Sequence, residues 1–162
     1  MPNHCHNRVT FYNGNDTDEA RKSIEDIRAM FDEESIFTQI IPEPDWVNTP
    51  LMSKDVQGLV YDRGKVGELP VMTKTSYGMS SRFPSTGHQD DRWYDWRVQN
   101  WDPKWDCYDV VVTDEDPECT EVEFNTAWSP PEAICNALRE QYPDLSISWF
   151  YDEPGCEIAG YL

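Results

Sequence analysis

Residues 121–151, EVEFNTAWSPPEAICNALREQYPDLSISWFY, contain the pattern that decides the fold. In the first eight of these residues Glu121, Glu123 and Asn125 face one side and the alternate residues face the other, which is the period of a strand with one buried face. We expect that buried face to carry Val122, Phe124, Thr126 and Trp128. The sequence therefore predicts a half-buried strand that begins near Glu121.

A helix is predicted to follow this strand directly. Ser129 is a favoured N-cap, Pro130 suits the first helical position, and Glu132 completes a Ser-x-x-Glu capping box. Pro143 ends the helical run. Between these limits an apolar stripe has helical spacing and predicts one buried face, and it consists of Ile134, Ala137, Leu138 and Tyr142.

Two further strands complete the C-terminal third. Residues 145–151 alternate again, and the turn DEPG at 152–155 reverses the chain into a last strand at 156–162. The predicted order is thus β-α-β-β. A helix that joins two strands of one sheet makes a right-handed crossover and lies across one sheet face.

The N-terminal segment has the same order of strand and helix. Residues 4–12 alternate as a strand, and the cluster NGN at 13–15 predicts a turn. Asp16, with Glu19 three positions later, predicts the N-cap of a helix. The apolar stripe of this helix consists of Ala20, Ile24, Ile27 and Phe31.

The periodic pattern dissolves after Phe37. Residues 38–89 hold five prolines and five glycines, and so long a connection predicts a partly ordered insertion with small helices or turns. A short helix at 90–100, a strand at 107–112 and an acidic loop at 114–118 are expected next. We therefore predict one domain, residues 1–162, with an insertion at about 38–100.

Together these elements predict a fold of the α+β class. Two β-α-β units in this order correspond to a ferredoxin-like split β-α-β sandwich. We expect an antiparallel sheet with two helices on one face and a long insertion after the first helix.

Length and cysteine usage indicate a cytoplasmic protein. A chain of 162 residues can bury about 70% of its unfolded surface without a metal or a disulfide. Its five cysteines are odd in number, include no Cys-x-x-Cys pair and match no iron–sulfur spacing, so free thiols and no cofactor are expected. No leader and no apolar run of membrane length is present in the sequence, so no membrane contact is expected.

The charge of the chain is its most unusual bulk property. The 31 acidic and 13 basic residues give a net charge of −18, which disfavours direct binding to nucleic-acid phosphates. The acidity either keeps the protein soluble or forms a surface that imitates nucleic acid and docks on a basic partner. The candidate interaction surface consists of Asp114, Glu115, Asp116, Glu118, Glu121 and Glu123.

An aromatic cluster is the second candidate site. Its members either pin the insertion onto the core or form a base-stacking platform or pocket wall, and packing is the commoner use of buried aromatic residues. The residues are Trp93, Trp96, Trp101, Lys104 and Trp105.

His4 and His6 are weak candidates for metal ligands. On a strand both imidazoles would face one side, as metal ligands often do. No second pair of ligands has a suitable spacing, so a polar sheet face is the simpler interpretation.

Four segments carry a family resemblance: MPNHCHNRVTFYNG at 1–14, WYDWRVQNWDPKWD at 93–106, VEFNTAWSPPEAICNAL at 122–138 and YPDLSISWFYDEPGCEIAG at 142–160. They resemble the YubB-type ferredoxin-like domain family of phage, prophage and plasmid proteins of unknown function. His4 stands where proteins of this family commonly carry Trp, and Asp102-Pro103 stands where they usually carry Gly-Thr. We therefore expect the loop between Trp101 and Lys104 to make different contacts. The resemblance implies a mobile-element protein with a ferredoxin-like fold and no catalytic residues.

Three hypotheses of function follow. In the first, a small acidic, non-enzymatic protein binds a host macromolecule in the host cytoplasm, most simply a host protein, and modulates it as an inhibitor or nucleic-acid mimic. In the second, a small-ligand or nucleotide-binding domain uses the aromatic cluster and the insertion as a pocket. In the third, a metal-dependent enzyme is centred on His4 and His6. The sequence leaves the oligomeric state open.

Overall fold

A computed structural model describes residues 3–55 and 63–162, apart from the side chains of Asp114 and Glu115. The chain divides into two compact units. Unit 1 consists of Met1–Pro42 and Arg97–Leu162, and unit 2 is Glu43–Trp96. Unit 2 falls inside the segment that the sequence analysis assigns to an insertion.

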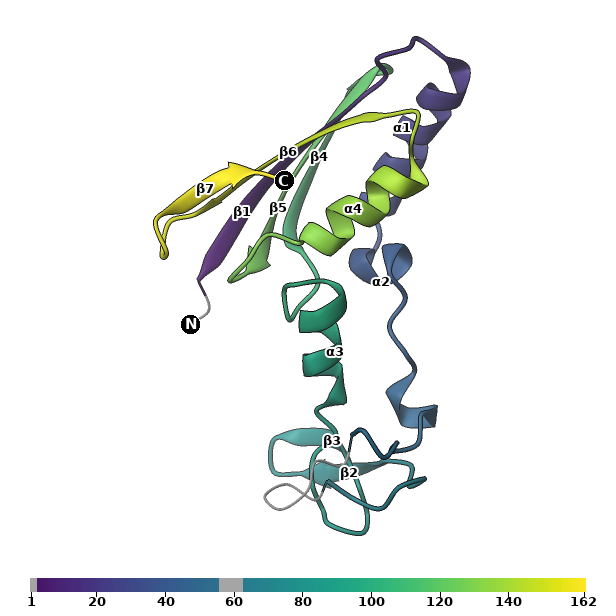
Figure 1. Cartoon of the computed structure of the whole chain (residues 1–162), viewed down its shortest axis with the longest axis vertical. Helices are drawn as coiled ribbons and strands as arrows, with labels where there is room; N and C mark the ends of the chain where they lie inside the picture. The colour runs from purple at the N-terminus through teal and green to yellow at the C-terminus, as the bar shows by residue number, and fades with distance from the viewer. Residues whose placement is uncertain (1–2, 56–62) are drawn as a thin grey trace. The chain divides into compact units, whose positions relative to one another are not determined.

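Unit 1 is built on a five-stranded antiparallel sheet with the strand order β4-β5-β1-β6-β7 (Figure 1). The predicted antiparallel sheet is therefore confirmed. β1 is the central strand and pairs with β5 on one side and β6 on the other. The strands are β1 (His4–Tyr12), β4 (Tyr108–Asp116), β5 (Cys119–Ala127), β6 (Ser146–Glu153) and β7 (Ile158–Tyr161).

One face of this sheet is apolar because side chains alternate along each strand. In β1 every second residue from Cys5 to Phe11 is buried. The register places Val9 beside Val122 of β5 and Trp149 of β6, and all three side chains are fully buried. The apolar face is thus continuous across the three central strands.

Two amphipathic helices, α1 (Asp18–Phe31) and α4 (Glu132–Gln141), cover the apolar face (Figure 1). A short helix, α2 (Ile36–Ile40), lies beside them. The predicted stripe of α1 is confirmed, since its buried residues are Ala20, Ile24, Ile27 and Phe31.

The structure corrects the predicted start of α1. The N-cap is Thr17 and not Asp16, and the Thr17 hydroxyl accepts a hydrogen bond from the Ala20 amide at 3.2 Å. Asp16 instead pairs with Arg21. The prediction was one residue off because Asp and Thr are both good N-caps and only the backbone geometry chooses between them.

The predicted start of α4 is also wrong. The helix begins at Glu132, and the residue before it, Pro131, makes no capping hydrogen bond. Asp102 supplies the missing acceptor, because the Ala133 amide donates to its Oδ2 at 2.8 Å. A residue 31 positions away therefore caps the helix in place of Ser129.

Two strand features differ from the prediction. β5 ends at Ala127, and Trp128 is 49% exposed with a φ of 73°, so Trp128 does not belong to the buried face. Residues 114–116 belong to β4 rather than to a loop. A tight turn at 117–118 joins β4 to β5, because the backbone pairing continues to Asp116.

Unit 2 contains short elements. The predicted helix at 90–100 is α3 (Arg92–Asn100), of which residues 92–96 belong to unit 2. The hairpin of β2 (Val71–Thr75) and β3 (Gly78–Arg82) was not predicted. A single turn, η1 (Trp46–Asn48), precedes them.

A buried ion pair organises unit 2. The Nε and Nη2 atoms of Arg92 donate to the two carboxylate oxygens of Asp90, each at 2.9 Å. The same guanidinium donates to the carbonyls of Trp46 at 3.1 Å and Pro50 at 3.2 Å, and lies over the rings of Trp46 and Phe83. Arg92 is 3% exposed, so one charged side chain forms the centre of this small core.

Candidate functional site

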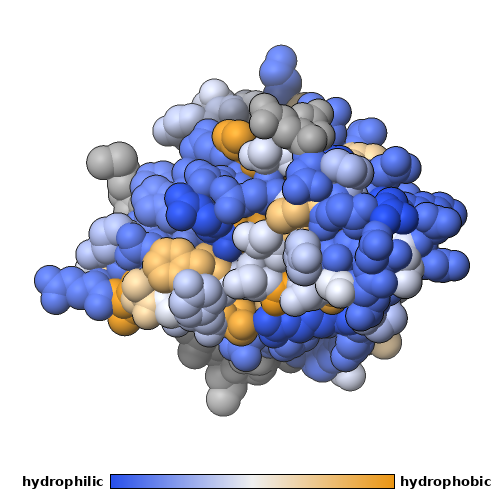
Figure 2. All heavy atoms as spheres, turned by 90° about the horizontal axis from the view of Figure 1, so that it is seen from above, coloured by the Kyte–Doolittle hydropathy of each residue, from blue (hydrophilic) through white to orange (hydrophobic). Residues whose placement is uncertain are grey.

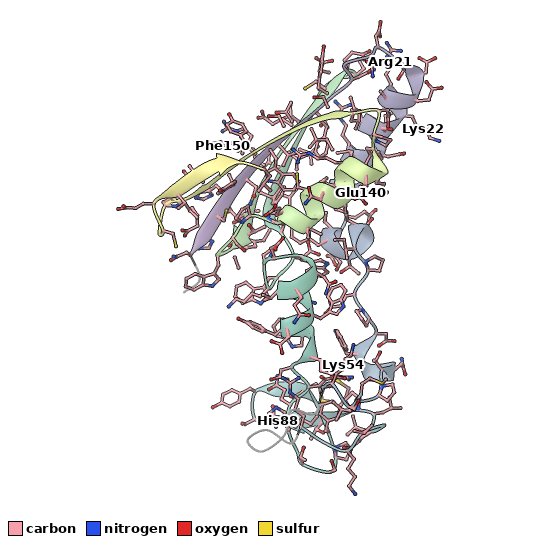
Figure 3. The ribbon with its side chains drawn as sticks, viewed as in Figure 1. Arg21, Lys22, Lys54, His88, Glu140 and Phe150 are labelled. Carbon is pink, nitrogen blue, oxygen red and sulfur yellow. The ribbon has the colours of Figure 1, made fainter. Side chains whose placement is uncertain are left out.

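The sheet face of unit 1 that lies opposite the helices is open to solvent. The residues of β1 that alternate with the buried ones face this side, and they include His4, His6 and Arg8. Phe150 of β6 also lies on this side, away from α1 and α4 (Figure 3). Antiparallel sheets often have one wet face, so exposure alone assigns no function.

A hydrogen-bond chain orients the ring of His6. The Asn125 side-chain amide donates from Nδ2 to Asp109 at 3.1 Å, which turns Asn125 Oδ1 towards His6 Nδ1 at 2.5 Å. An amide oxygen can only accept, so His6 Nδ1 is the donor in this hydrogen bond. The open face therefore presents an imidazole ring held in a defined orientation.

A hollow of about 290 Å³ lies on the open face, between β5, β1 and β6. The register sets Arg8 between Glu123 and Phe150, and it sets His6 beside Asp152. The hollow thus combines charged, polar and aromatic groups suited to recognition through hydrogen bonds. Its lining residues are His6, Asn7, Arg8, Glu123, Phe150 and Asp152.

Sequence reasoning missed Phe150 and Asp152 as members of a site. The alternation over 145–151 places Phe150 on the outer face, but the pairing of β6 with β1 decides that Phe150 lies beside Arg8. No local signal specifies that register.

The two histidine candidates do not form a metal centre in the described part of the chain. His4 Nδ1 is hydrogen-bonded to the Tyr108 hydroxyl at 2.6 Å, and His6 Nδ1 to Asn125. Within residues 3–55 and 63–162, no group of three or more His, Cys, Asp or Glu side chains is placed to hold an ion. The metal-dependent hypothesis therefore gains no support from this geometry.

The cysteines are poor nucleophiles. Burial raises the pKa of Cys5 to about 11 and also raises the pKa of Cys107, Cys119 and Cys135. A hydrogen bond with Glu153 raises the pKa of Cys156. The thiolate is the reactive form, so these thiols stay protonated at neutral pH.

The predicted acidic surface is partly neutralised at the turn between β4 and β5. Glu118 accepts hydrogen bonds from Arg21 Nε at 2.5 Å and from Asn13 Nδ2 at 2.7 Å. Asp116 is exposed, and its Oδ1 accepts from the Glu118 amide at 2.8 Å. The side chains of Asp114 and Glu115 lie outside the described part of the structure.

Glu121 and Glu123, the other two residues of the predicted acidic surface, lie on the open sheet face. Arg8 Nε is 2.9 Å from Glu123 and 4.0 Å from Glu121. All three side chains are about half exposed, and such pairs contribute about 1 kcal/mol or less. Arg8 nevertheless places a positive charge within the predicted acidic surface.

The predicted aromatic cluster is divided between the two units. Trp101 is fully buried in unit 1, where its ring contacts Phe37 edge to face and its Nε1 donates to the Ile41 carbonyl at 3.0 Å. Trp105 is 38% exposed, and Lys104 Nζ lies 4.4 Å from the centre of its ring. Trp93 and Trp96 belong to unit 2.

Unit 2 has a hollow of about 430 Å³ beside the hairpin. The hairpin turn exposes Tyr77 completely, and Gly78 follows with a φ of 119° that favours glycine. Of the predicted aromatic cluster, this hollow includes Trp93. Its lining residues are Thr75, Tyr77, Met79, Ser80, Ser81, Arg82, Gln89, Asp90 and Trp93.

Within the described ranges, no helix is long and apolar enough to span a bilayer.

Comparison with known proteins supports the assignment of the C-terminal part. The family described as the ferredoxin-like domain in Api92-like protein matches residues 107–162. These residues form a ferredoxin-like domain. They extend from the start of β4 to the end of β7, so the match covers four strands of the sheet and α4.

Among solved structures, the crystal structure of a protein api92 from Yersinia pseudotuberculosis is similar to this chain at 12% sequence identity and a TM-score of 0.47. The similarity covers 99% of this chain and 93% of that one. No curated protein matches the sequence.

Proposed function

We propose that this is a non-enzymatic binding protein of a mobile genetic element, and that its acidic unit 1 docks on a basic macromolecule in the host cytoplasm. The uneven distribution of charge carries the proposal. Residues 43–96 hold eight acidic and six basic residues, a net charge of −2, which leaves −16 of the total −18 on unit 1. The acidity is therefore a property of the unit that contains the sheet.

Internal pairing leaves most of this charge in place. Arg8 pairs with Glu123 and Arg21 with Glu118, whereas Arg28 and Arg139 donate to backbone carbonyls and neutralise no carboxylate there. Unit 1 has only seven basic residues against 23 acidic ones. The face seen in Figure 2 is correspondingly hydrophilic, with hydrophobic residues scattered over it.

The negative electrostatic field of unit 1 suits a partner with a basic groove. Opposite fields steer two proteins together and speed their association, whereas nucleic acid itself would be repelled. A host protein that binds nucleic acid through such a groove fits this requirement, and occupying the groove would inhibit it. We place the contact on the predicted acidic surface of β4 and β5, led by Asp116 and Glu123, which are both exposed.

The test is capture of host proteins on the immobilised full chain, followed by elution with duplex DNA. If the acidic surface occupies a nucleic-acid groove, the captured protein elutes with DNA. Its association rate should also fall steeply with salt, since the screening length drops from about 10 Å at 0.1 M to about 3 Å at 1 M.

Two variants with the same change in net charge separate a local contact from the general field. Asp116→Lys with Glu123→Lys should slow association, whereas Asp32→Lys with Glu33→Lys, just beyond α1, should do so much less. A captured protein indifferent to DNA, to salt and to both variants would overturn the proposal and leave the charge as a solubility device.

We also infer that the fold of unit 1 is the split β-α-β arrangement that the resemblance to the YubB-type family implies, and that unit 2 lies within an insertion at about 38–100. The strand order supports this, because β5 lies between β1 and β4, and β1 lies between β5 and β6. Each helix would then connect two strands that are not direct neighbours.

A further inference from the structure

We propose that the outer edge of β2 is a docking surface for a second copy of this chain, and that two copies join β2 to β2 about a two-fold axis. In the described part of the chain β2 pairs with β3 alone, so unit 2 has a sheet of two strands (Figure 1). A two-stranded sheet is marginally stable by itself, and an unpaired strand edge is a template for another chain. Joining the two copies gives a four-stranded sheet, β3-β2-β2-β3.

The register decides which backbone groups of β2 point away from β3. Along an antiparallel pair, residues alternate between those bonded to the partner strand and those whose N–H and C=O groups face outwards. Ser81 lies opposite Met72, and its carbonyl accepts from the Asp90 amide at 2.9 Å, on the side of β3 away from β2. Met72 and Ser81 are therefore a non-hydrogen-bonded pair, and so are Lys74 and Met79. The backbone groups of Met72 and Lys74 thus face the outer edge.

A two-fold axis through Thr73 makes this edge self-complementary. It sets Met72 of one copy opposite Lys74 of the other, so that these two residues exchange N–H···O=C hydrogen bonds on each side of the axis. The outward groups of both strands are then paired. Thr73 lies opposite Thr73 of the second copy in a non-hydrogen-bonded pair, with about 4.5 Å between the Cα atoms. Such an isologous contact closes as a dimer.

The side chains on one face of the hairpin fit this pairing. Met72, Lys74 and Met79 share that face, and all three are exposed. A lysine often prevents an edge strand from pairing. In the dimer, however, Lys74 lies between Met79 of its own copy and Met72 of the other, so its aliphatic stem packs against two thioether side chains while its ammonium stays in water.

The distribution of charge favours a second copy at this edge. Two molecules of net charge −18 repel each other wherever their acidic surfaces meet. Residues 69–89 contain Lys74 and Arg82 and no acidic residue, and no other stretch of the sequence without an acidic residue is as long. Two copies can therefore approach each other along β2 against little repulsion.

The dimer should be weak and should respond to salt in a characteristic direction. Five residues from each copy bury far less than the standard interface of about 1,600 Å², so we expect a dissociation constant between about 1 μM and about 1 mM. Salt screens the repulsion between the copies and should strengthen the dimer, whereas it weakens docking on a basic host protein. Either proposal can therefore fail without the other.

The first experiment measures amide hydrogen exchange of the full chain by NMR at about 50 μM and about 1 mM protein, with sedimentation velocity of the same samples. The amides of Met72 and Lys74 should become at least about twofold more protected at the higher concentration, as the dimer forms. The Thr73 amide already faces β3, so its exchange should not change.

Engineered cysteines test the register. Thr73→Cys, made in a Cys156→Ser parent that lacks the exposed native thiol, should form a covalent dimer with oxidised glutathione. The two Cα atoms, about 4.5 Å apart, lie within the range that a disulfide spans. Val71→Cys is the matched control, because position 71 is also exposed on β2. The two copies of residue 71 lie about 14 Å apart along the strands, so this variant should not cross-link.

A proline variant tests the edge itself. Met72→Pro removes an outward N–H group and leaves the hydrogen bonds between β2 and β3 in place, so it should abolish the dimer and keep the monomer folded. Met72→Leu should dimerise like the wild type. Circular dichroism checks the fold of both variants.

Four outcomes would each overturn the proposal. They are a monomer at about 1 mM protein at every salt concentration, equal cross-linking of Thr73→Cys and Val71→Cys, and dimerisation of folded Met72→Pro as in the wild type. The fourth is protection of the Met72 and Lys74 amides only after another protein is added, which would assign the edge to that protein.

Discussion

Asp102 shows how one side chain from a distant loop can determine where a helix begins. Its Oδ2 accepts from the Ala133 amide, and its backbone has a φ of 78°, in the left-handed region that favours glycine. Asp102 therefore keeps a backbone conformation that glycine adopts more easily, and its side chain caps α4.

Three substitutions at Asp102 test this interpretation. Asp102→Ala should lower the free energy of unfolding by about 1–2 kcal/mol, because the cap is lost and a β-carbon remains in the left-handed region. Asp102→Asn should retain most of the stability, and Asp102→Gly should lie between the two. Urea unfolding followed by circular dichroism measures the order, and equal values for Ala and Asn would contradict the capping role.

The burial of Asp106 should make the free energy of unfolding depend on pH. Its carboxylate accepts hydrogen bonds from the Phe37 amide at 3.0 and 3.1 Å, but burial raises its pKa above the ordinary value of 3.8. Because the folded-state pKa is the higher one, the folded state binds more protons in the window above 3.8. The contribution of Asp106 to stability therefore falls as pH rises through that window.

Comparison of wild type with Asp106→Asn isolates this effect from the other carboxylates. Relative to the variant, the wild type should lose free energy of unfolding as pH rises above 3.8 and through the raised folded-state pKa, and the difference should then be constant. Urea titrations at each pH measure it. Two curves that stay parallel over the whole range would show that Asp106 has the same pKa in both states.

At the scale of elements, Arg92 connects the parts of unit 2 that have little regular structure. It joins the start of α3 to η1, to the Pro50 carbonyl and to Phe83. Arg92→Met leaves Asp90 buried without its counter-ion, which should cost about 3–5 kcal/mol. Amide hydrogen exchange should then speed up across residues 43–96.

The double variant Asp90→Ala with Arg92→Met provides the control. It removes both charges, so it should be less destabilising than the sum of the two single variants. Strict additivity would mean that the pair does not act as a unit. Hydrogen-exchange protection unchanged by Arg92→Met would show that the folding of unit 2 does not depend on this ion pair.

At the scale of the whole molecule, a net charge of −18 opposes compaction. We expect the unfolding temperature to rise between about 0.01 M and about 1 M sodium chloride, as the screening length falls from about 30 Å to about 3 Å. A variant in which exposed Glu25, Asp32, Glu33 and Glu34 are replaced by their amides should respond less to salt. Equal salt responses in differential scanning calorimetry would show that charge repulsion does not limit stability.

The sequence by itself determined the strands and the two long helices of the sheet-containing unit. The alternation from Cys5 to Phe11 and the helical stripe from Ala20 to Phe31 are both found buried as predicted, because strand and helix periods are recorded locally in the chain. The antiparallel sheet follows from the order of these elements. The net charge is equally explicit in the sequence.

Only the tertiary structure decided which residues far apart in the sequence contact one another. It places Asp102 at the start of α4, pairs Arg92 with the loop carbonyls of Trp46 and Pro50, and sets Phe150 beside Arg8. It also brings Ser80 and Ser81 to one hollow with Trp93. Periodicity reports which side of an element is buried, whereas these contacts depend on strand register and loop path, which no local pattern specifies.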